Sequence, residues 1–207
     1  IYFCTQGTYG PGISGVLNLD SPQRPPTMYG ATKLMGELLG RAYDQRFGVD
    51  FRCIRFSPLF GPGADVNTFS SPLNRIIQEP ALGRPNRVPM GERRQVHGIY
   101  LKDASRAFLE LFRAPAEKVP SRFYLLQGVA TNFGALADLV RSILPSAEIT
   151  FDEGDEDPRR PERAERDDDR VDERVARQEW GWRAAYSVED AVADYIRAVQ
   201  SDPQRYG

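Results

Sequence analysis

The stretch MYGATKLMGELLGRAYDQRF (residues 28–47) lies between two apolar runs, IYFCT (residues 1–5) and VDFRCIRF (residues 49–56). Its apolar residues recur at helical spacing, and Gly48 directly after it is a typical helix-ending residue. One apolar face of the predicted helix is formed by Leu34, Leu38, Leu39 and Ala42. The flanking runs have the character of buried strands. A strand, a long helix and a second strand within about 60 residues form a βαβ unit, which predicts a parallel sheet.

The composition is that of an ordinary globular protein and argues against several classes of function. The chain has 207 residues, 41% of them hydrophobic and 27% charged, with a formal net charge of −2. No apolar run approaches the ~20 residues of a membrane-spanning helix, so we expect no membrane partner. A net charge near zero gives no basis for nucleic-acid binding. Cys4 and Cys53 are too few for a disulfide framework or a four-ligand zinc site, so we expect reduced thiols, no metal site and a cytoplasmic protein.

Mixed helices and strands continue along the rest of the chain. The patterns predict helices at residues 67–79, 102–112, 131–144 and 186–200, and strands at residues 95–101, 122–126 and 147–151. Thr131 and Ser187 are the expected N-caps of the last two helices. The segment from residue 152 to residue 174 is dense in Asp, Glu and Arg, and a charge run of this kind is typical of a solvated loop.

A glycine-rich loop at residues 10–15 imitates a dinucleotide-binding motif. Its sequence, GPGISG, has the spacing G-x-G-x-x-G and follows a predicted strand. In that motif the third glycine opens a helix whose N-terminal amides bind a pyrophosphate. Here Gly15 is followed by Pro22 and by the pair Pro25-Pro26, which cannot sustain such a helix. We therefore interpret residues 10–15 as a loop without a phosphate-binding role.

Tyr29 and Lys33 are the first candidates for chemistry. They lie four positions apart near the start of the predicted helix, so both side chains project from one face. A neighbouring cation favours the phenolate form of a tyrosine, which suits the pair to proton transfer. The preceding predicted strand ends at Thr5, and ligands of open parallel sheets bind at the carboxyl ends of the strands. A hydroxyl, a phenol and an ammonium group are thus expected near one sheet edge.

Thr5, Tyr29 and Lys33 together resemble the Ser/Thr–Tyr–Lys triad of the short-chain dehydrogenase/reductase superfamily. The similarity is greatest to its extended branch, the NAD(P)-dependent epimerase/dehydratases. Further stretches resemble that branch in the same order: FCTQGTYG (residues 3–10), YGATKLMGE (29–37), RFSPLFGPG (55–63), IYLKDA (99–104) and a segment at 172–182 that ends in WGW. The resemblance therefore covers nearly the whole chain.

The resemblance implies a role for each member of the triad. Tyr29 would be the general acid/base that exchanges a proton with a substrate hydroxyl or carbonyl while hydride moves to or from NAD or NADP. Lys33 would bind the nicotinamide ribose and favour the phenolate of Tyr29. Thr5 would hydrogen-bond the same substrate oxygen and fix its geometry. The alternative for Thr5 is a strand-end hydroxyl that bonds a nearby backbone group.

The resemblance also assigns binding residues, and two departures from the family pattern bear on the substrate. Backbone groups of Ser57 and Pro58 would lie beside the nicotinamide, with Leu59 near them, and Gln6 would contact the substrate. Members that act on nucleotide sugars usually carry Asn where this chain has Pro58, and often Arg where it has Val96. Compensating phosphate contacts are open to two neighbouring arginines, which could equally be solvated surface residues: Arg93 and Arg94.

These departures leave alternatives open. The first expectation is an enzyme acting on a sugar or nucleotide sugar. The second is a dehydrogenase or reductase of a small sugar acid, polyol or other hydroxy or keto compound. A third is a non-catalytic relative that binds a partner through its long helices, although a chain without catalysis has no physical need for all of Thr5, Tyr29 and Lys33. The single histidine, His97, receives no catalytic role.

The architecture implied by the resemblance is a Rossmann-like, doubly wound parallel sheet of the α/β class, incomplete at its N-terminus. Because no credible phosphate-binding glycine loop is present, we expect roughly 100 further residues, with the first βαβ units, before Ile1. Residues 1–60 would belong to the cofactor domain, with residues 95–127 rejoining its sheet. Residues 61–94 and 128–207 would form a smaller substrate-binding region. A homodimer through the long first helix is also expected.

Overall fold

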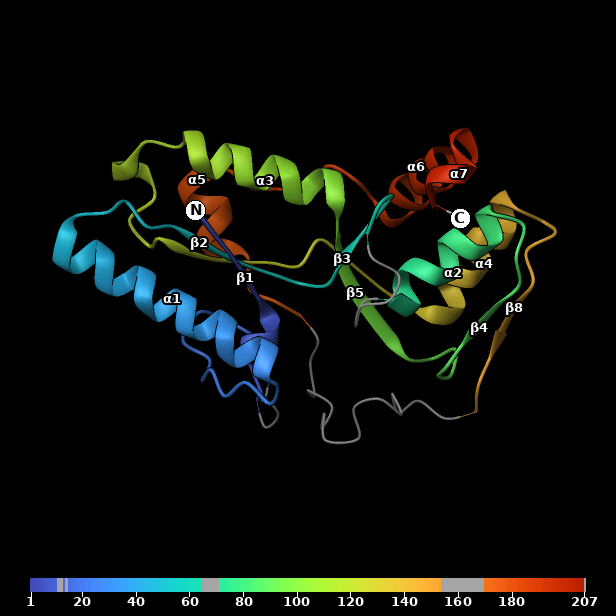
Figure 1. Cartoon of the computed structure of the whole chain (residues 1–207), viewed down its shortest axis with the longest axis horizontal. Helices are drawn as coiled ribbons and strands as arrows, with labels where there is room; N and C mark the ends of the chain where they lie inside the picture. Colours follow the sequence, from blue (N-terminus) through green and yellow to red (C-terminus); the bar gives the residue numbers. More distant parts are fainter. Residues whose placement is uncertain (11–12, 14, 65–70, 154–169, 207) are drawn as a thin grey trace. The chain divides into compact units, whose positions relative to one another are not determined.

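The computed structural model describes residues 1–10, 13, 15–64, 71–153 and 170–206 (Figure 1). Within these residues, no helix is both long and apolar enough to cross a membrane. The chain divides into two compact units, and each unit draws on separate stretches of the sequence.

The first unit is an α/β sandwich built on a parallel sheet. It contains residues 1–58, 103–128 and, in the late part of the chain, 170–183. Its strands are all parallel and follow the order β1 (Tyr2–Thr5), β2 (Cys53–Phe56) and β6 (Phe123–Leu126). Figure 1 shows helix α1 (Met28–Phe47) on one face of this sheet, with α3 (Leu101–Arg113) and α5 (Arg174–Trp180) on the other.

Successive side chains of β1 serve the two faces alternately, as the pleat of a strand requires. Phe3 stacks on Phe108 of α3, with their ring centres 4.8 Å apart. Tyr2 points to the other face, where its hydroxyl donates a hydrogen bond of 3.2 Å to the backbone oxygen of Lys33 in α1. The predicted βαβ unit is therefore present, and the parallel pairing of its strands is confirmed.

Helix α1 has the predicted bounds, but much of its predicted apolar face is exposed. Thr27 caps its start and Gly48, with φ of 66°, ends it in the left-handed conformation. Leu38 is 57% exposed and Leu39 is 53% exposed. The sheet is approached by glycines instead, because a Cβ atom added to Gly36 would lie 2.3 Å from the Tyr2 hydroxyl. The sequence therefore has the apolar pattern of an amphipathic helix, but most of that apolar face is exposed.

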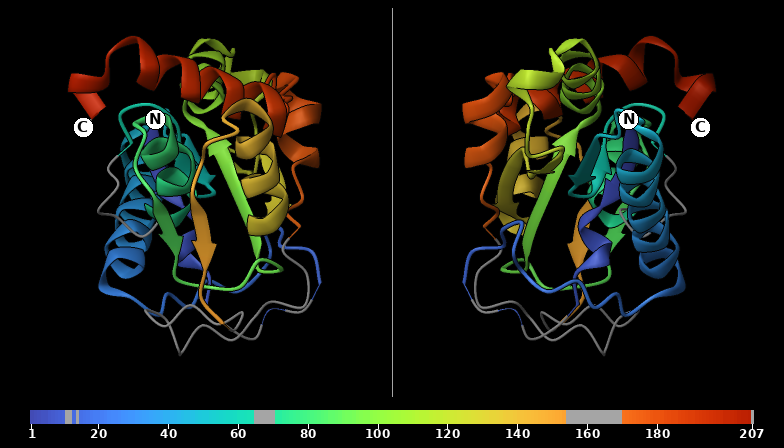
Figure 2. Two further views of the ribbon diagram at one scale, coloured as in Figure 1. Left: turned by 90° about the vertical axis from the view of Figure 1, so that its right-hand side faces the viewer. Right: turned by 90° about the vertical axis from the view of Figure 1, so that its left-hand side faces the viewer.

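The second unit contains residues 59–102, 129–153 and 184–206. Its strands form two small sheets, β3 (Leu59–Phe60) with β5 (Gln95–Tyr100) and β7 (Val129–Asn132), and β4 (Asn86–Val88) with β8 (Ile149–Phe151). Figure 2 shows β4 and β8 running side by side in the same direction. The described helices are α2 (Ser71–Ala81), α4 (Phe133–Ile143), α6 (Val188–Ser201) and α7 (Pro203–Tyr206). They enclose an apolar core that includes Ile76, Leu136 and Ile196.

The helix expected at residues 131–144 starts later than predicted. Val129–Asn132 is strand β7, which pairs antiparallel with β5. Helix α4 therefore begins at Phe133, and Asn132 rather than Thr131 is its N-cap, accepting a hydrogen bond of 2.8 Å from the Ala135 backbone. The cap of α6 is confirmed, since Ser187 and Asp190 form a reciprocal capping box.

The two units also divide the chain differently from the expected domains. Of residues 95–127, β6 joins the first sheet, whereas β5 pairs with β3 and β7 in the second unit. The late segment adds to the first unit, because Leu17 forms backbone hydrogen bonds of 3.0 Å with Arg170 and 2.8 Å with Asp172. The end of the charged run, at residues 170–172, therefore pairs with Leu17 and is not a solvated loop. Residues 154–169 of that run, and residues 11, 12 and 14 of the glycine-rich loop, lie outside the described residues.

Candidate active site

The site begins where β1 ends. Thr5 is the N-cap of a short 3-10 helix, η1 (Gln6–Thr8), and its hydroxyl oxygen accepts a hydrogen bond of 3.0 Å from the Gly7 backbone. A threonine hydroxyl has a donor hydrogen in addition to its lone pairs. The backbone-bonded alternative for Thr5 is therefore observed, and it leaves the hydroxyl able to donate to a substrate oxygen.

The start of α1 packs directly on this turn. A Cβ atom added to Gly30 would lie only 2.2 Å from the backbone oxygen of Gly7, so a glycine is what permits this approach. A Cβ atom added to Gly7 would lie 3.4 Å from the Thr5 side chain and 3.9 Å from the Tyr29 ring. Thr5 and Tyr29 thus border the same small space, and Tyr29 is 58% exposed.

Lys33 lies one turn further along α1. Its ammonium nitrogen donates a hydrogen bond of 3.0 Å to the backbone oxygen of Phe3 and lies 5.9 Å from the centre of the Tyr29 ring. The structure therefore brings Thr5, Tyr29 and Lys33 together at the carboxyl end of β1, as the sequence predicts.

The other candidate residues fall into two groups. Gln6 and Ser57 are buried at the same sheet edge, where the Gln6 amide nitrogen donates to Leu126 O at 3.1 Å and the Ser57 hydroxyl donates to Gln127 O at 2.6 Å. The side-chain oxygen of Gln6 is buried and has no hydrogen-bond partner among the described residues. Pro58 directly follows Ser57 at the end of the first unit. The remaining candidates lie in the second unit: Leu59, Arg93 and Arg94.

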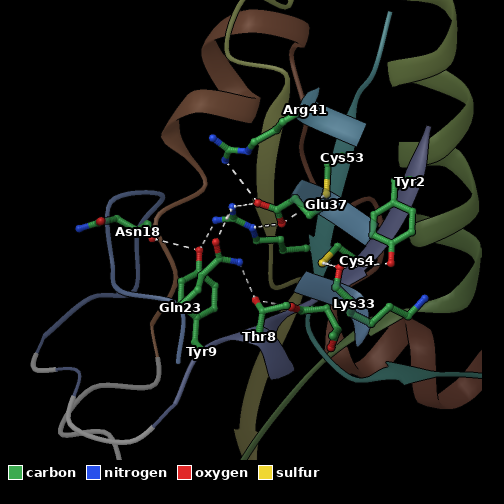
Figure 3. A network of polar contacts seen from close by, with 12 residues as sticks. Tyr2, Cys4, Thr8, Tyr9, Asn18, Gln23, Lys33, Glu37, Arg41 and Cys53 are labelled. Atoms are coloured by element: carbon green, nitrogen blue, oxygen red, sulfur yellow. Dashed lines mark hydrogen bonds and ion pairs between the residues drawn. The ribbon is translucent and has the colours of Figure 1, made fainter. Parts of the chain in front are cut away.

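A buried ion pair that the sequence analysis did not identify holds α1 to β2 (Figure 3). Glu37 is 0% exposed and Arg55 is 1% exposed. The Arg55 guanidinium donates to both carboxylate oxygens, at 2.9 Å from Nε and 2.5 Å from Nη2. Arg55 also donates to the Tyr9 hydroxyl, and it reaches the Gln23 side-chain oxygen at 3.3 Å. The local signal for this pair was an Arg inside an apolar strand and a Glu on the helix face that carries Lys33.

The protonation state of the pair follows from its surroundings. Burial alone would raise the pKa of the Glu37 carboxyl, but the hydrogen bonds and the charge of Arg55 outweigh burial and hold that pKa below its usual value. Burial raises the pKa of the Tyr9 hydroxyl despite the nearby Arg55 charge, so Tyr9 stays protonated and donates to Asn18 O at 3.3 Å. The pair is therefore ionised at neutral pH.

Cys4, Glu37 and Cys53 form a buried cluster of potential metal ligands, with their ligand atoms within 4.8 Å of one another. Both cysteines are free thiols, as predicted. Burial raises the pKa of the Cys53 thiol strongly, which disfavours the thiolate that a metal would need. Both oxygens of Glu37 already accept hydrogen bonds from Arg55. We therefore interpret the cluster as part of the helix–sheet packing.

The fold and the site define a Rossmann-like α/β protein with a Thr–Tyr–Lys site at the carboxyl end of a parallel strand. Residues 1–126 match the sequence model of the NAD dependent epimerase/dehydratase family. The chain belongs to this family, which confirms the resemblance that the sequence motifs indicate.

Individual relatives agree with the family assignment. The mitochondrial L-threonine 3-dehydrogenase of Bos taurus is 31% identical over 183 residues, which are 84% of this chain and 46% of that protein. The structure of L-threonine dehydrogenase from Clostridium difficile is 25% identical, with a TM-score of 0.82 over 99% of this chain and 64% of that one. UDP-glucuronic acid 4-epimerase from Bacillus cereus, in complex with NAD, has the same fold at 19% identity, with a TM-score of 0.75 over 96% of this chain and 61% of that one. The chain thus spans about half the length of the curated dehydrogenase that it matches.

Removing one member of the buried pair is expected to destabilise the protein strongly. In Glu37→Ala the Arg55 charge stays buried without its partner, which typically costs about 3–5 kcal/mol of unfolding free energy. Urea denaturation measures this loss. Asp138→Ala is the matched control, because it removes the exposed Asp138–Arg141 pair and is expected to cost at most about 1 kcal/mol. Similar losses for both variants would contradict the assigned role of burial.

The same pair is expected to make stability sensitive to acid. Because the folded pKa of Glu37 is lowered, its contribution is fully present above the unfolded carboxyl value of about 4.3 and is lost as the pH falls through the lower folded value. The difference in unfolding free energy between the wild type and Glu37→Gln should therefore narrow as the pH falls from about 6 to about 3. A difference that stays constant over this range would show that Glu37 is not ionised in the folded protein.

Proposed function

We propose that this chain carries the acid–base site of an NAD-dependent dehydrogenase that oxidises the hydroxyl group of a small substrate of the L-threonine class. The observation that carries the proposal is that Thr5 and Tyr29 meet around Gly7, with Lys33 beside Tyr29, in a chain of the NAD dependent epimerase/dehydratase family. The L-threonine dehydrogenases among its relatives support this choice of substrate class.

The residues present fit the nicotinamide end of NAD. The missing Cβ of Gly7 leaves room beside Thr5 and Tyr29, and the Lys33 ammonium nitrogen lies 5.9 Å from the centre of the Tyr29 ring. In the proposal Lys33 binds the nicotinamide ribose, and the backbone of Ser57 and Pro58, which directly follow β2, lies beside the nicotinamide ring. When bound, NAD supplies the acceptor for the hydride that leaves the substrate carbon.

The chain's own residues handle the proton and the geometry. The Thr5 hydroxyl donates a hydrogen bond to the substrate oxygen and holds it near the Tyr29 phenol. Tyr29 acts as the general base and takes the proton of the substrate hydroxyl while the carbon–oxygen double bond forms. The Lys33 ammonium lies beside this group, 5.9 Å from the centre of the Tyr29 ring. In the reverse direction Tyr29 returns the proton to the carbonyl oxygen.

Two features favour a small substrate over the nucleotide sugar that the sequence analysis considered first. Pro58 stands where nucleotide-sugar enzymes usually have Asn, and Val96 stands where they often have Arg. Gln6 is buried beside Thr5, and its side-chain oxygen has no partner in the part of the chain that the structure describes, so a substrate ammonium or hydroxyl that donates to this oxygen would satisfy it. Arg93 and Arg94 remain the proposed phosphate contacts for the nucleotide-sugar alternative.

The substitution Tyr29→Phe tests the acid–base role. It removes the phenolic oxygen and keeps the ring, so kcat with L-threonine and NAD should fall by about 10²–10⁴-fold while folding is unchanged. NADH formation is measured with the protein expressed from its complete gene. Tyr43→Phe is the control, since Tyr43 is exposed on the same helix and is given no catalytic role. Wild-type turnover by Tyr29→Phe would overturn the mechanism, and turnover with a nucleotide sugar but not with L-threonine would overturn the substrate class.

We further propose that α1 forms a homodimer with its copy. Its outward face carries a set of exposed apolar side chains: Met28, Met35, Leu38, Leu39, Tyr43 and Phe47. A concentration of exposed apolar side chains on one helix is typical of an interaction site. The resemblance to the extended short-chain enzymes supports a second copy of this chain as the partner.

Charged substitutions on this face should dissociate the dimer. Leu38→Glu combined with Leu39→Glu places unpaired charges in the proposed interface, so light scattering should give a monomer mass for the variant and a dimer mass for the wild type. Leu109→Glu is the control, because Leu109 is exposed on α3, on the other face of the sheet. A monomeric wild type, or a variant that stays dimeric, would contradict the proposal.

A further inference from the structure

The Glu37–Arg55 pair lies on the helix face that carries the catalytic candidates. Lys33 and Glu37 follow Tyr29 by four and eight positions, which places all three side chains along one side of α1. Glu37 is fully buried against the sheet, and Arg55 of β2 holds it through two hydrogen bonds. A bidentate contact of this type fixes direction as well as distance.

Besides this pair, hydrogen bonds between α1 and β1 also limit the position of the helix, and each of them involves Lys33. Glycines make the close contacts: a Cβ atom on Gly40 would lie 2.0 Å from the Phe51 ring, and one on Gly36 would lie 2.3 Å from the Tyr2 hydroxyl. Small residues let the helix approach closely but provide no side chain that interlocks with the sheet. Most of the large apolar residues of α1 are exposed. Rotation and sliding of α1 must therefore be limited by directional polar contacts.

The polar contacts continue from the ion pair to the third catalytic candidate (Figure 3). Arg55 donates to the Gln23 side-chain oxygen at 3.3 Å, and the Gln23 amide donates to the Thr8 hydroxyl at 3.0 Å. Thr8 in turn donates to the backbone oxygen of Thr5 at 3.0 Å. One connected network thus links the helix that carries Tyr29 to the strand end that carries Thr5.

We propose that Glu37 and Arg55 are positioning residues for catalysis: their ion pair sets the rotation and register of α1 on the sheet, and so the placement of Tyr29 and Lys33 relative to Thr5. The inference rests on the proposed function of these three residues and deepens it. A misplacement of catalytic groups by about 1 Å can cost about 100-fold in rate. The pair therefore acts on turnover through geometry, without touching the substrate or the cofactor.

A purely structural role of the pair makes a different prediction, so an experiment can separate it from the positioning role. Buried ion pairs can often be replaced by apolar residues of similar size without loss of stability, whereas removal of one partner leaves a buried charge. The double variant Glu37→Met/Arg55→Met removes both charges together. It retains the bulk between α1 and β2 and abolishes the directional hydrogen bonds.

The experiment measures stability, NAD affinity and steady-state kinetics of this double variant in the protein expressed from its complete gene. We expect it to fold and to bind NAD as the wild type does, with KM within about threefold and kcat reduced by about 100-fold. A kcat reduced less than about fivefold would overturn the proposal.

Two further variants keep the outcome interpretable. Arg52→Met is the matched control: Arg52 is also a buried arginine, in the segment leading into β2, but it donates to Leu111 O and Ala114 O at the end of α3. It should lower stability and leave kcat within about twofold. If the double variant does not fold, Arg55→Lys takes its place, since it keeps the charge and loses the bidentate geometry; unchanged kcat in Arg55→Lys would overturn the proposal.

Tyr29→Phe is measured in parallel and separates the inference from the function on which it rests. If Tyr29→Phe is inactive and the double variant keeps wild-type kcat, only the positioning role fails. If Tyr29→Phe keeps wild-type turnover, the proposed function fails, and the positioning role fails with it.

Discussion

The ionic contact between Glu37 of α1 and Arg55 of β2 organises the first unit. Moving two charges out of water is costly, and it is tolerated here because Arg55 satisfies both carboxylate oxygens. The contact occupies the side of the helix where an apolar core would ordinarily lie. Glycines on that side let α1 approach the sheet closely, so Tyr29 and Lys33 come to the end of β1 while the leucines face outward.

Much of the fold could be predicted from local patterns. The bounds of α1, the parallel β1–β2 pair and the cap of α6 follow from periodicity and capping residues. The orientation of α1 could not be predicted in this way, because periodicity reveals an apolar face without saying what it contacts. Tertiary pairing also overrode local signals at Val129–Asn132. These residues resemble the start of a helix, but they form a strand because they pair with β5.

The residues of the candidate site also fall into those that the sequence could predict and those that only the fold reveals. Tyr29 and Lys33 could be found because they are four positions apart on one helix. Thr5 could be found because it ends the strand that precedes this helix. Glu37 and Arg55 are 18 positions apart on different elements, so their pairing depends on how α1 lies across the sheet. The Gln6 amide nitrogen bonds Leu126 of β6, far along the chain, and the Gln6 oxygen has no partner among the described residues. This arrangement likewise depends on the tertiary fold. Spacing in the sequence reveals the chemistry, and packing reveals the residues that arrange it.

The family assignment and the geometry lead to one central claim, that Thr5, Tyr29 and Lys33 act together on a substrate hydroxyl beside NAD. A crystal structure of the protein from its complete gene, with NAD and a substrate analogue, tests this claim most directly. The account predicts that the Thr5 hydroxyl and the Tyr29 phenol hydrogen-bond the same substrate oxygen while Lys33 bonds the nicotinamide ribose. A substrate oxygen held by other residues, or a nicotinamide ring bound away from the start of α1, would contradict it.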